Sequence, residues 1–356
     1  MQMRNYFDSG ITKPYAFRKE QLIKLQQAVK KYEQPLHEAL FVDLKKSPEE
    51  CWVTETGFLL SELSNILKHL KGWMQPESVS TNLLNLPSKS FILQEPLGVV
   101  LIISPWNYPF QLLMTPLAGA MAAGNCVILK SSEFAPATSA VMKQMIEETF
   151  DKNYIQFVEG DGAVVIPEMM NNFTFDHVFY TGSTAVGKLV YKMAAERLVP
   201  VTLELGGKSP CVVEEDANIK IAAKRIAMTK FSNAGQMCVA PDYVLVHESR
   251  KEELIAGLKK SIHGFFGDKP EDSENYGKII NGKQFDRLVK YLQQGQLIHG
   301  GRNDKEKLFI EPTVISNVSL DADIMKDEIF GPILPVISFS SKAEALKIIA
   351  QNKNPL

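Results

Sequence analysis

The sequence has few of the features that mark several specialised classes of protein. Its 356 residues include only four cysteines, none in a CxxC spacing and none grouped with histidines, so it predicts no zinc site and no disulfide framework. Few, scattered cysteines are typical of a reducing compartment. The first residues also lack the apolar stretch of a secretory signal. We therefore expect a cytoplasmic protein without a bound metal ion.

The chain also lacks runs of like charge and long apolar runs. Its 39 basic and 41 acidic residues are mixed and give a net charge of −2, which predicts neither a nucleic-acid groove nor a membrane surface. The longest apolar runs, Val99–Ile103 and Leu112–Ala123, are shorter than the ~20 residues needed to span a bilayer. The expected partner is a small-molecule substrate.

Helical periodicity dominates the first part of the chain. In residues 17–73, apolar residues recur at spacings of three and four, which predicts helices interrupted by Pro35 and Pro48. Two short β-forming segments, 78–81 and 90–93, then flank a Pro-Ser-Lys turn and predict a hairpin.

Strand and helix patterns alternate from residue 99 onward, in two series. Such alternation predicts an α/β fold with a mostly parallel sheet and helices on both faces. In the first series the expected strands are 99–104, 126–130, 155–159, 178–181 and 201–205, and the expected helices are 111–123, 135–150, 162–171 and 184–198. In the second series the expected strands are 210–213, 243–247 and 333–339, and the expected helices are 218–231, 250–263 and 282–294.

Two short stretches carry reactive side chains. Cys238 ends Asn-Ala-Gly-Gln-Met-Cys between a helix and a strand, where Gly235 permits a tight loop. Glu204 ends a β run and is followed by two glycines, at the edge where α/β sheets bind ligands. A lone cysteine is more often a small buried hydrophobic residue, and such a glutamate can be an ordinary solvated one.

Four further stretches suit ligand binding. Two prolines stiffen the Pro-Trp-Asn-Tyr-Pro loop around Asn107, so its amide can act as a fixed donor. The run from Tyr180 to Gly187 reads as strand, small-residue turn and helix start, which favours phosphate but is neither a dinucleotide fingerprint nor a complete P-loop. The Lys-Ser-Ser-Glu run from Lys130 and the Glu-Ile-Phe-Gly-Pro run from Glu328 could each be ordinary surface turns.

Together, in this order, the six motifs resemble those of the aldehyde dehydrogenases, and most closely the class 3 branch with its fatty-aldehyde and medium-chain enzymes. The resemblance implies a Rossmann-like NAD(P)-binding domain at 1–78 and 98–205, an oligomerisation hairpin at 79–97 and an α/β catalytic domain at 206–356. It also implies a homodimer for a full-length chain. Because the family normally continues beyond Leu356, we expect the catalytic domain to be truncated at its C-terminus.

The resemblance assigns the catalytic roles. Cys238 is the nucleophile that forms a thiohemiacetal and then a thioester with the aldehyde, Glu204 is the general base, and Asn107 stabilises the oxyanion. The cofactor is NAD or NADP. NAD is favoured because a carboxylate at Glu133 would repel a 2′-phosphate. The implied cofactor-binding residues are Trp106, Lys130, Glu133, Gly182, Ser183, Thr184, Ala185, Val186, Gly187, Leu205, Glu328 and Phe330.

Three alternatives accompany this prediction. A CoA-acylating enzyme does not need a hydrolytic base, so Glu204 argues against it. A phosphorylating dehydrogenase pairs its cysteine with a histidine, but none of the six histidines lies in a motif. A non-catalytic member of the same fold could result from truncation, although both the nucleophile and the base are present.

Overall fold

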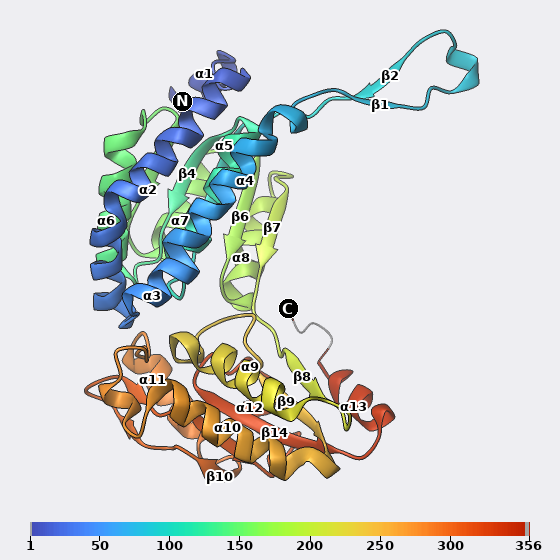
Figure 1. Cartoon of the computed structure of the whole chain (residues 1–356). Helices are drawn as coiled ribbons and strands as arrows, with labels where there is room; N and C mark the ends of the chain where they lie inside the picture. The colour runs from blue at the N-terminus through green and yellow to red at the C-terminus, as the bar shows by residue number, and fades with distance from the viewer. Residues whose placement is uncertain (1, 353–355) are drawn as a thin grey trace. The chain divides into compact units, whose positions relative to one another are not determined.

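The computed structural model describes residues 2–352 and Leu356, which divide into two compact units (Figure 1). Unit 1 comprises residues 1–39 and 49–204, and unit 2 comprises residues 40–48 and 205–356. The predicted domain boundaries place residues 40–48 and Leu205 in the first domain instead. Segment 40–48 belongs to unit 2 because its backbone carbonyls accept hydrogen bonds there: Leu44 from the Lys278 amide at 3.0 Å, and Val42 from Lys278 Nζ at 2.7 Å.

Helices begin unit 1, and one of them differs from expectation. Helix α2 runs through Pro35, where the sequence pattern predicts an interruption. Pro35 faces solvent, whereas Leu22, Leu25 and Leu36 are fully buried, so apolar burial compensates for the hydrogen bond that the proline removes. The helical elements are α1 (Gln2–Asp8), α2 (Tyr15–Leu44), α3 (Pro48–Cys51), the π-helical turn η1 (Trp52–Thr56) and α4 (Gly57–Trp73).

The predicted hairpin is confirmed and extends away from the body of unit 1 (Figure 1). Strands β1 (Glu77–Val79) and β2 (Ser90–Ile92) pair antiparallel, Glu77 opposite Ile92. The 3₁₀ turn η2 (Leu83–Asn85) lies in the connection between them, so the turn is wider than the Pro-Ser-Lys turn of the prediction.

The five predicted strands of unit 1 form one parallel sheet with the order β5-β4-β3-β6-β7. The chain winds from β3 towards β5 and then returns towards β7, so right-handed crossovers place α5 and α6 on one face and α7 and α8 on the other. The elements are β3 (Val99–Ile103), α5 (Gln111–Ala123), β4 (Cys126–Lys130), α6 (Pro136–Thr149), β5 (Ile155–Val158), α7 (Gly162–Asn172), β6 (His177–Thr181), α8 (Thr184–Ala195) and β7 (Val201–Glu204).

Unit 2 has a mixed sheet with the order β10-β13-β14-β9-β8, in which only β10 is antiparallel to its neighbour. Its strands are β8 (Pro210–Val213), β9 (Tyr243–His247), β10 (Gln296–His299), β13 (Thr313–Ser316) and β14 (Ile333–Phe339), and β11 (Asn303–Asp304) pairs with β12 (Phe309–Ile310). The helical elements are α9 (Ile219–Phe231), η3 (Ser232–Gly235), η4 (Glu248–Arg250), α10 (Lys251–Phe266), η5 (Pro270–Asp272), α11 (Gly282–Tyr291), α12 (Asp323–Lys326) and α13 (Lys342–Ile349).

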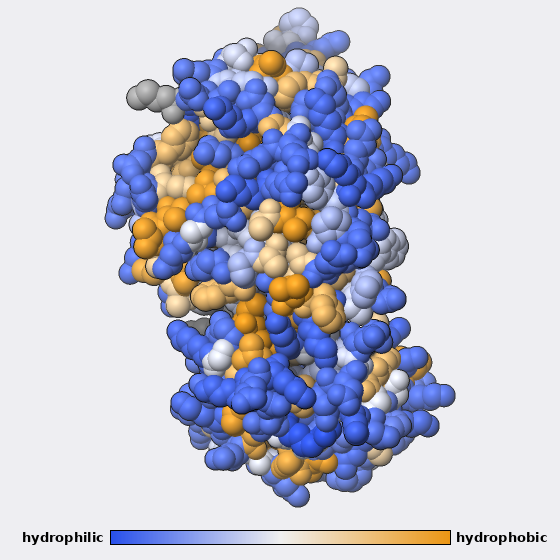
Figure 2. Space-filling view, turned by 90° about the vertical axis from the view of Figure 1, so that its left-hand side faces the viewer, coloured by the Kyte–Doolittle hydropathy of each residue, from blue (hydrophilic) through white to orange (hydrophobic). Residues whose placement is uncertain are grey.

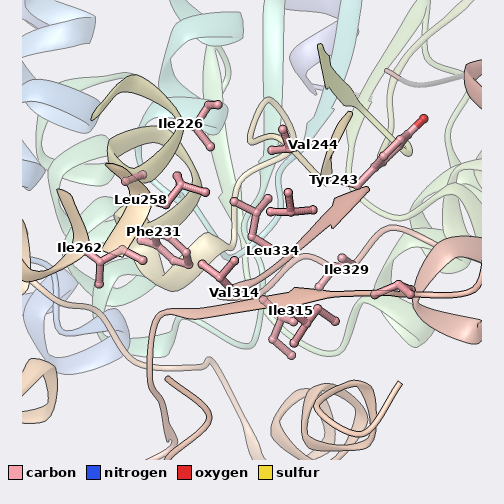
Figure 3. Packing of buried hydrophobic residues seen from close by; sticks show 14 of the residues in the cluster. Ile226, Phe231, Tyr243, Val244, Leu258, Ile262, Val314, Ile315, Ile329 and Leu334 are labelled. Atoms are coloured by element: carbon pink, nitrogen blue, oxygen red, sulfur yellow. The ribbon is translucent and has the colours of Figure 1, made fainter. Parts of the chain in front are cut away.

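Part of the core of unit 2 lies between this sheet and the pair of helices α9 and α10 (Figure 3). Phe231, Leu258 and Ile262 come from the helices, and Val244 and Leu334 come from the central strands. Phe231, the last residue of α9, is buried in this core, and the segment that leads to Cys238 begins directly after it.

Hydrophilic residues predominate on the face of the molecule drawn in Figure 2, with apolar side chains in separate groups. No helix among the described residues is both long and apolar enough to cross a membrane.

Candidate functional site

The candidate residues of unit 1 follow the carboxyl ends of its parallel strands. The direction of winding reverses between β3 and β6, and open parallel sheets bind ligands outside the carboxyl ends at such a reversal. Trp106 and Asn107 follow β3, Lys130 ends β4 and precedes Glu133, the segment Gly182–Gly187 follows β6, and Glu204 ends β7. The fold thus brings these separate motifs to one edge of one sheet.

The Asn107 loop is fixed at both ends. At its start, the Ser104 amide donates to the carbonyl of Lys130 at 3.1 Å, which ties the ends of β3 and β4 together. At its end, the Gln111 amide at the N-terminus of α5 donates to Oε2 of Glu55 at 2.8 Å. Glu55 lies in η1 and is fully buried, and no motif in the sequence marked it. Asn107 is only 2% exposed, so the loop holds its side chain in a packed position.

Lys130 and Glu133 form a polar pair beside the loop. Lys130 is 1% exposed, and its Nζ lies 3.4 Å from Oε2 of Glu133. The other oxygen of Glu133 accepts from the Gly162 amide at 3.3 Å, at the first residue of α7. The Glu133 carboxylate is therefore held between the end of β4 and the start of α7.

The start of α8 has the features of an anion site. Ser183 caps this helix by accepting from the Val186 amide at 3.4 Å, and the first-turn residues Thr184–Val186 are exposed. A Cβ on Gly182 would lie 2.4 Å from the hydroxyl oxygen of Tyr180, so only glycine fits at this turn. Because the first amides of a helix have no partner within the helix, they can donate to a phosphate.

Glu204 presents an exposed carboxylate at the end of β7. Its backbone carbonyl accepts from the Gly182 amide at 2.9 Å, so this residue lies beside the start of the α8 turn. Leu205, the next residue, belongs to unit 2.

In unit 2, the loop that carries Cys238 has an unusual backbone. Three consecutive residues, Asn233, Ala234 and Gly235, have positive φ values of 48°, 51° and 74°. Two of them are not glycine, and residues of this kind hold such a conformation only when their surroundings stabilise it.

The buried side chain of Gln236 stabilises this loop. Its Nε2 donates to the carbonyls of Asn233 at 3.0 Å and Lys278 at 2.9 Å, while its Oε1 accepts from the Ile280 amide at 3.0 Å. Asn233 Nδ2 donates in return to the Gln236 carbonyl at 3.2 Å. One glutamine thus ties the loop to the neighbouring segment 278–280.

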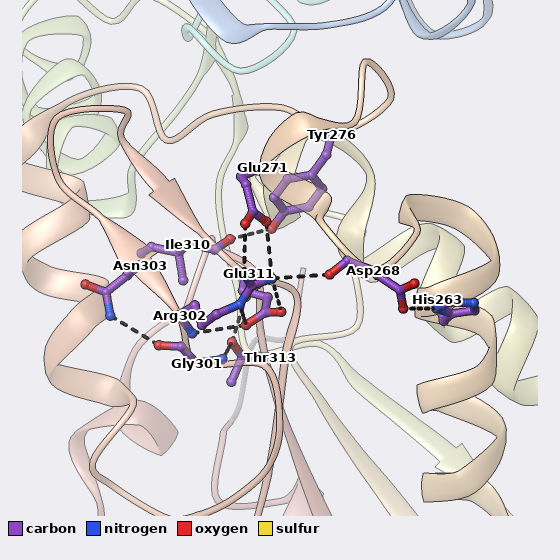
Figure 4. Close-up of polar contacts among 10 residues, drawn as sticks. All are labelled: His263, Asp268, Glu271, Tyr276, Gly301, Arg302, Asn303, Ile310, Glu311 and Thr313. Carbon is purple, nitrogen blue, oxygen red and sulfur yellow. Dashed lines mark hydrogen bonds and ion pairs between the residues drawn. The ribbon is translucent and has the colours of Figure 1, made fainter.

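Segment 278–280, to which Gln236 is hydrogen-bonded, is held in place by further contacts. The Ile279 amide donates to the Leu308 carbonyl at 2.9 Å, and the Tyr276 hydroxyl donates to the Ile310 carbonyl at 2.7 Å. Close by, Arg302 pairs with Glu271 at 2.8 Å and with Glu311 at 2.9 Å (Figure 4). This polar network gives the Cys238 loop a fixed support.

Gly235 also brings two motifs together. A Cβ at this position would lie 2.3 Å from the Gly331 carbonyl oxygen and 2.9 Å from the Pro332 nitrogen. The Cys238 loop and the Glu-Ile-Phe-Gly-Pro turn are therefore packed backbone against backbone. Cys238 itself is partly exposed, two residues beyond buried Gln236.

Glu328, the first residue of the Glu-Ile-Phe-Gly-Pro turn, also packs closely against a glycine of unit 2. A Cβ on Gly206 would lie 2.0 Å from its Oε2, so the carboxylate rests against the two glycines that follow Leu205. Burial, together with the negative charge of Asp242, raises the pKa of Glu328 to about 7. Phe330, two residues on, has a positive φ of 49°.

The Ile329 peptide between them is held at both ends. Its amide donates to Oδ1 of Asp242 at 2.8 Å, and its carbonyl accepts from Nη2 of Arg287 at 2.7 Å. These contacts stabilise the strained conformation of Phe330 and fix the direction of the Glu328 side chain.

The described residues contain no group of three or more His, Cys, Asp or Glu side chains placed to hold a metal ion. The groups on these elements that can take part in chemistry are a partly exposed thiol in unit 2, an exposed carboxylate and a buried amide in unit 1, and a helix start able to bind an anion.

Comparisons with known proteins agree with this arrangement. The profile of the aldehyde dehydrogenase family matches residues 4–355. The chain is 48% identical to the 4,4'-diaponeurosporen-aldehyde dehydrogenase of Staphylococcus aureus, over 99% of this chain and 76% of the relative. It is 40% identical to the dimeric, NADP-preferring aldehyde dehydrogenase of Mus musculus, over 99% and 78%.

A solved structure has the same fold. The substrate-bound state of Staphylococcus aureus AldH superposes with a TM-score of 0.96 at 48% identity, covering 99% of this chain and 77% of that one.

Proposed function

Because the chain belongs to the aldehyde dehydrogenase family and is an oxidoreductase acting on aldehyde groups, we propose that Cys238 is its covalent nucleophile, Glu204 its general base and Asn107 its oxyanion donor. The observation that carries this proposal is the contrast between Cys238 and the other cysteines. Cys51 and Cys126 are buried, and burial raises the pKa of Cys126 to about 12. Cys211 is partly exposed like Cys238, but it lies within strand β8 and burial raises its pKa, whereas Cys238 lies just beyond the strained turn at 233–235.

The reaction follows from these three side chains. The Cys238 thiolate attacks the aldehyde carbon and forms a thiohemiacetal. The former carbonyl oxygen of the aldehyde becomes an oxyanion, which the Asn107 amide stabilises. A bound nicotinamide would supply the hydride acceptor for that carbon, and loss of the hydride would leave a thioester on Cys238. Glu204 then takes a proton from water as the water oxygen attacks the thioester carbon, and the C–S bond breaks to release the carboxylic acid and the Cys238 thiolate.

The chain has residues suited to hold such a cofactor. The exposed start of α8, whose Val186 amide is taken by the Ser183 cap, would bind the pyrophosphate through the amides of Thr184 and Ala185. Lys130 and Glu133 would contact the adenosine ribose, and Trp106, Gly182 and Gly187 would line the same edge. In unit 2, Leu205, Glu328 and Phe330 would contact the nicotinamide end.

Glu133 favours NAD over NADP in this proposal. Its carboxylate already accepts from the Gly162 amide and lies 3.4 Å from the Lys130 ammonium group, so it is held where a 2′-phosphate would meet like charge. Formation of NADH or NADPH at 340 nm, with one aliphatic aldehyde and each cofactor in parallel, tests both the activity and the preference. Absence of reduced cofactor with folded protein would contradict the proposed reaction.

Replacing Asn107 by alanine is expected to lower turnover by roughly 10²–10³-fold, because a lost oxyanion donor costs about 2.7–4 kcal/mol. NADH affinity should change little, since the side chain acts on the substrate oxygen. The measurement is paired: steady-state turnover and the thermal midpoint of the same variant.

A matched control for Asn107 is Asn125, which is also buried but whose side chain is hydrogen-bonded to two backbone groups. Asn125 Oδ1 accepts from the Gly98 amide at 3.0 Å, and its Nδ2 donates to the Ala120 carbonyl at 3.2 Å. Asn125→Ala should lower the thermal midpoint by leaving these groups unsatisfied, at about 1–3 kcal/mol each, with turnover per folded molecule preserved. If Asn107→Ala behaves like this control, Asn107 is a bracing residue and not the oxyanion donor.

The hairpin of unit 1 supports a second proposal, that it packs against another copy of this chain. Its connection exposes Leu83 and Leu84 at 83% and 91%, an unusual state for two adjacent leucines. The mouse relative is named as dimeric.

Replacing Leu83 and Leu84 together by lysine is expected to convert a dimer into a monomer, because charged side chains oppose burial at an apolar interface. Light scattering after gel filtration would measure the mass. Leu198→Lys is the matched control, since Leu198 is also 91% exposed but lies in the connection between α8 and β7. A dimer that persists in the double variant would show that the hairpin tip makes no essential contact.

A further inference from the structure

Glu55 is a fully buried carboxyl side chain in unit 1, and none of the six sequence motifs contains it. Burying a carboxylate is costly unless hydrogen bonds and positive charge compensate for the lost water. The Oε2 atom of Glu55 accepts from the Gln111 amide at 2.8 Å, at the first residue of α5. The compensation for its burial therefore comes in part from the start of that helix.

Helix α5 begins without a cap of its own. The residue before it, Phe110, has no side-chain oxygen, so it cannot accept from the first amides of the helix. The Leu112 amide donates back to the Tyr108 carbonyl at 3.0 Å, whereas the Gln111 amide donates to Glu55. A carboxylate in this position also meets the positive end of the helix dipole. Glu55 thus serves as the cap that the local sequence does not supply.

The contact at the start of α5 extends to Asn107 through the backbone. Asn107 directly precedes Tyr108, whose carbonyl is hydrogen-bonded to Leu112 in the first turn of the helix. The amide that Glu55 holds belongs to the residue just before Leu112. One side-chain hydrogen bond and one backbone hydrogen bond therefore connect Glu55 to the loop that carries Asn107, and a shift of this helix start would move Asn107 with it.

The π-helical turn η1 fixes the position of Glu55. The Gly57 amide donates to the Trp52 carbonyl, five residues back, which defines the turn. Thr56, the residue after Glu55, is also fully buried, and its hydroxyl oxygen lies 3.0 Å from Nε2 of His37 in α2. Two neighbouring side chains of η1 are thus tied to two different helices, α2 and α5. This arrangement gives Glu55 a firm base from which to hold the start of α5.

We propose that Glu55 is a positioning residue for Asn107: its buried carboxylate holds the first amide of α5 and so keeps the Asn107 amide directed at the oxyanion. This inference rests on the oxyanion role proposed above for Asn107. A donor stabilises a transition state only when it is correctly placed, and a misplacement of about 1 Å can cost roughly 10²-fold in rate. Loss of Glu55 should therefore lower kcat and leave KM and NADH affinity nearly unchanged.

The test is a double-mutant cycle of Glu55→Met and Asn107→Ala, with kcat and KM measured per folded molecule. Methionine is similar to glutamate in length but has no oxygen acceptor. Glu55→Met alone should lower kcat by roughly 10–10²-fold and leave KM within about twofold. In the Asn107→Ala background the same change should cost less than about twofold, because the donor that Glu55 positions is already absent.

Two controls separate positioning from general stability. Glu55→Gln keeps an oxygen that can accept from the Gln111 amide, so this variant should keep most of the kcat that Glu55→Met loses. Asp176 also accepts from a backbone amide, that of Val99 at 2.6 Å, but at the amino end of β3, opposite to the end from which the Asn107 loop continues. Asp176→Leu should lower the thermal midpoint and leave kcat unchanged, both alone and together with Asn107→Ala.

The outcomes distinguish this inference from the proposed function. An unchanged kcat in Glu55→Met, equal losses of kcat in the two backgrounds, or a loss in Glu55→Gln as large as in Glu55→Met would overturn the role of Glu55 and leave that of Asn107 in place. If Asn107→Ala itself keeps wild-type turnover, the oxyanion assignment is wrong and the inference falls with it. If Glu55→Met does not fold, the cycle uses Glu55→Asp, which withdraws the acceptor by one methylene group, and equal losses in both backgrounds would again overturn the inference.

Discussion

Replacing Cys238 by alanine is expected to reduce aldehyde oxidation by roughly 10⁴-fold or more, the scale of loss when an enzyme's covalent nucleophile is removed. Without the thiol no thiohemiacetal forms, so the hydride has no covalent adduct to leave from. NADH binding should be almost unchanged, because the residues proposed to bind the cofactor are intact. Turnover by initial NADH formation and affinity by fluorescence titration measure the two effects.

Cys211 provides the matched control for Cys238. It is also in unit 2 and partly exposed, but it lies within β8 and burial raises its pKa. Cys211→Ala should therefore retain turnover, and brief treatment of the wild type with iodoacetamide should label Cys238 first, as peptide mass spectrometry can show. If Cys238→Ala keeps more than a few per cent of wild-type turnover, the assignment of Cys238 as the nucleophile is wrong.

Most of the fold could be predicted because its strands and helices have strong periodic patterns. The buried strand β3 lies where an apolar run predicts it, and helix α5 lies where a helical pattern predicts it. Strands β10 and β13 are absent from the prediction, because each contains only two adjacent apolar residues, and so short an apolar run does not distinguish strand from loop or helix. Local pattern also failed at Pro35, where burial of the opposite helix face outweighs the missing hydrogen bond.

The reactive side chains were predictable, but the residues that hold the surrounding loops in place were only partly so. Gln236 and Lys208 lie inside recognised motifs, yet nothing in the sequence says that one clamps a strained loop and the other pairs with Asp242. Glu55 and Arg287 lie in no motif, because a residue that braces a backbone group needs only the right position in space. Such supports become visible only when segments distant in the chain are placed together.

Replacing Glu204 by glutamine is expected to slow release of the acid far more than formation of NADH. Glutamine keeps the shape of the side chain but cannot accept a proton from water, and general-base catalysis contributes about 10²–10⁴-fold. Steady-state turnover should fall by that factor, while the first turnover proceeds at nearly the wild-type rate. Stopped-flow absorbance should therefore show a burst of about one NADH per active site, followed by a slow phase, as a thioester accumulates.

The NADH burst of Glu204→Gln also distinguishes hydrolysis of the thioester from two alternatives, activation of the Cys238 thiol by Glu204 and transfer of the acyl group to coenzyme A. Glu196→Gln, an exposed glutamate beyond the end of α8, is the matched control and should show normal turnover. If the burst disappears and the first turnover slows as much as the steady state, then Glu204 acts on the Cys238 thiol and not on the hydrolytic water. If coenzyme A restores turnover of Glu204→Gln to the wild-type rate, the thioester is normally transferred to a thiol and the chain is an acylating enzyme. Because hydrolysis needs a base and thiol transfer does not, an exposed carboxylate ending β7 leads us to expect that coenzyme A has no such effect.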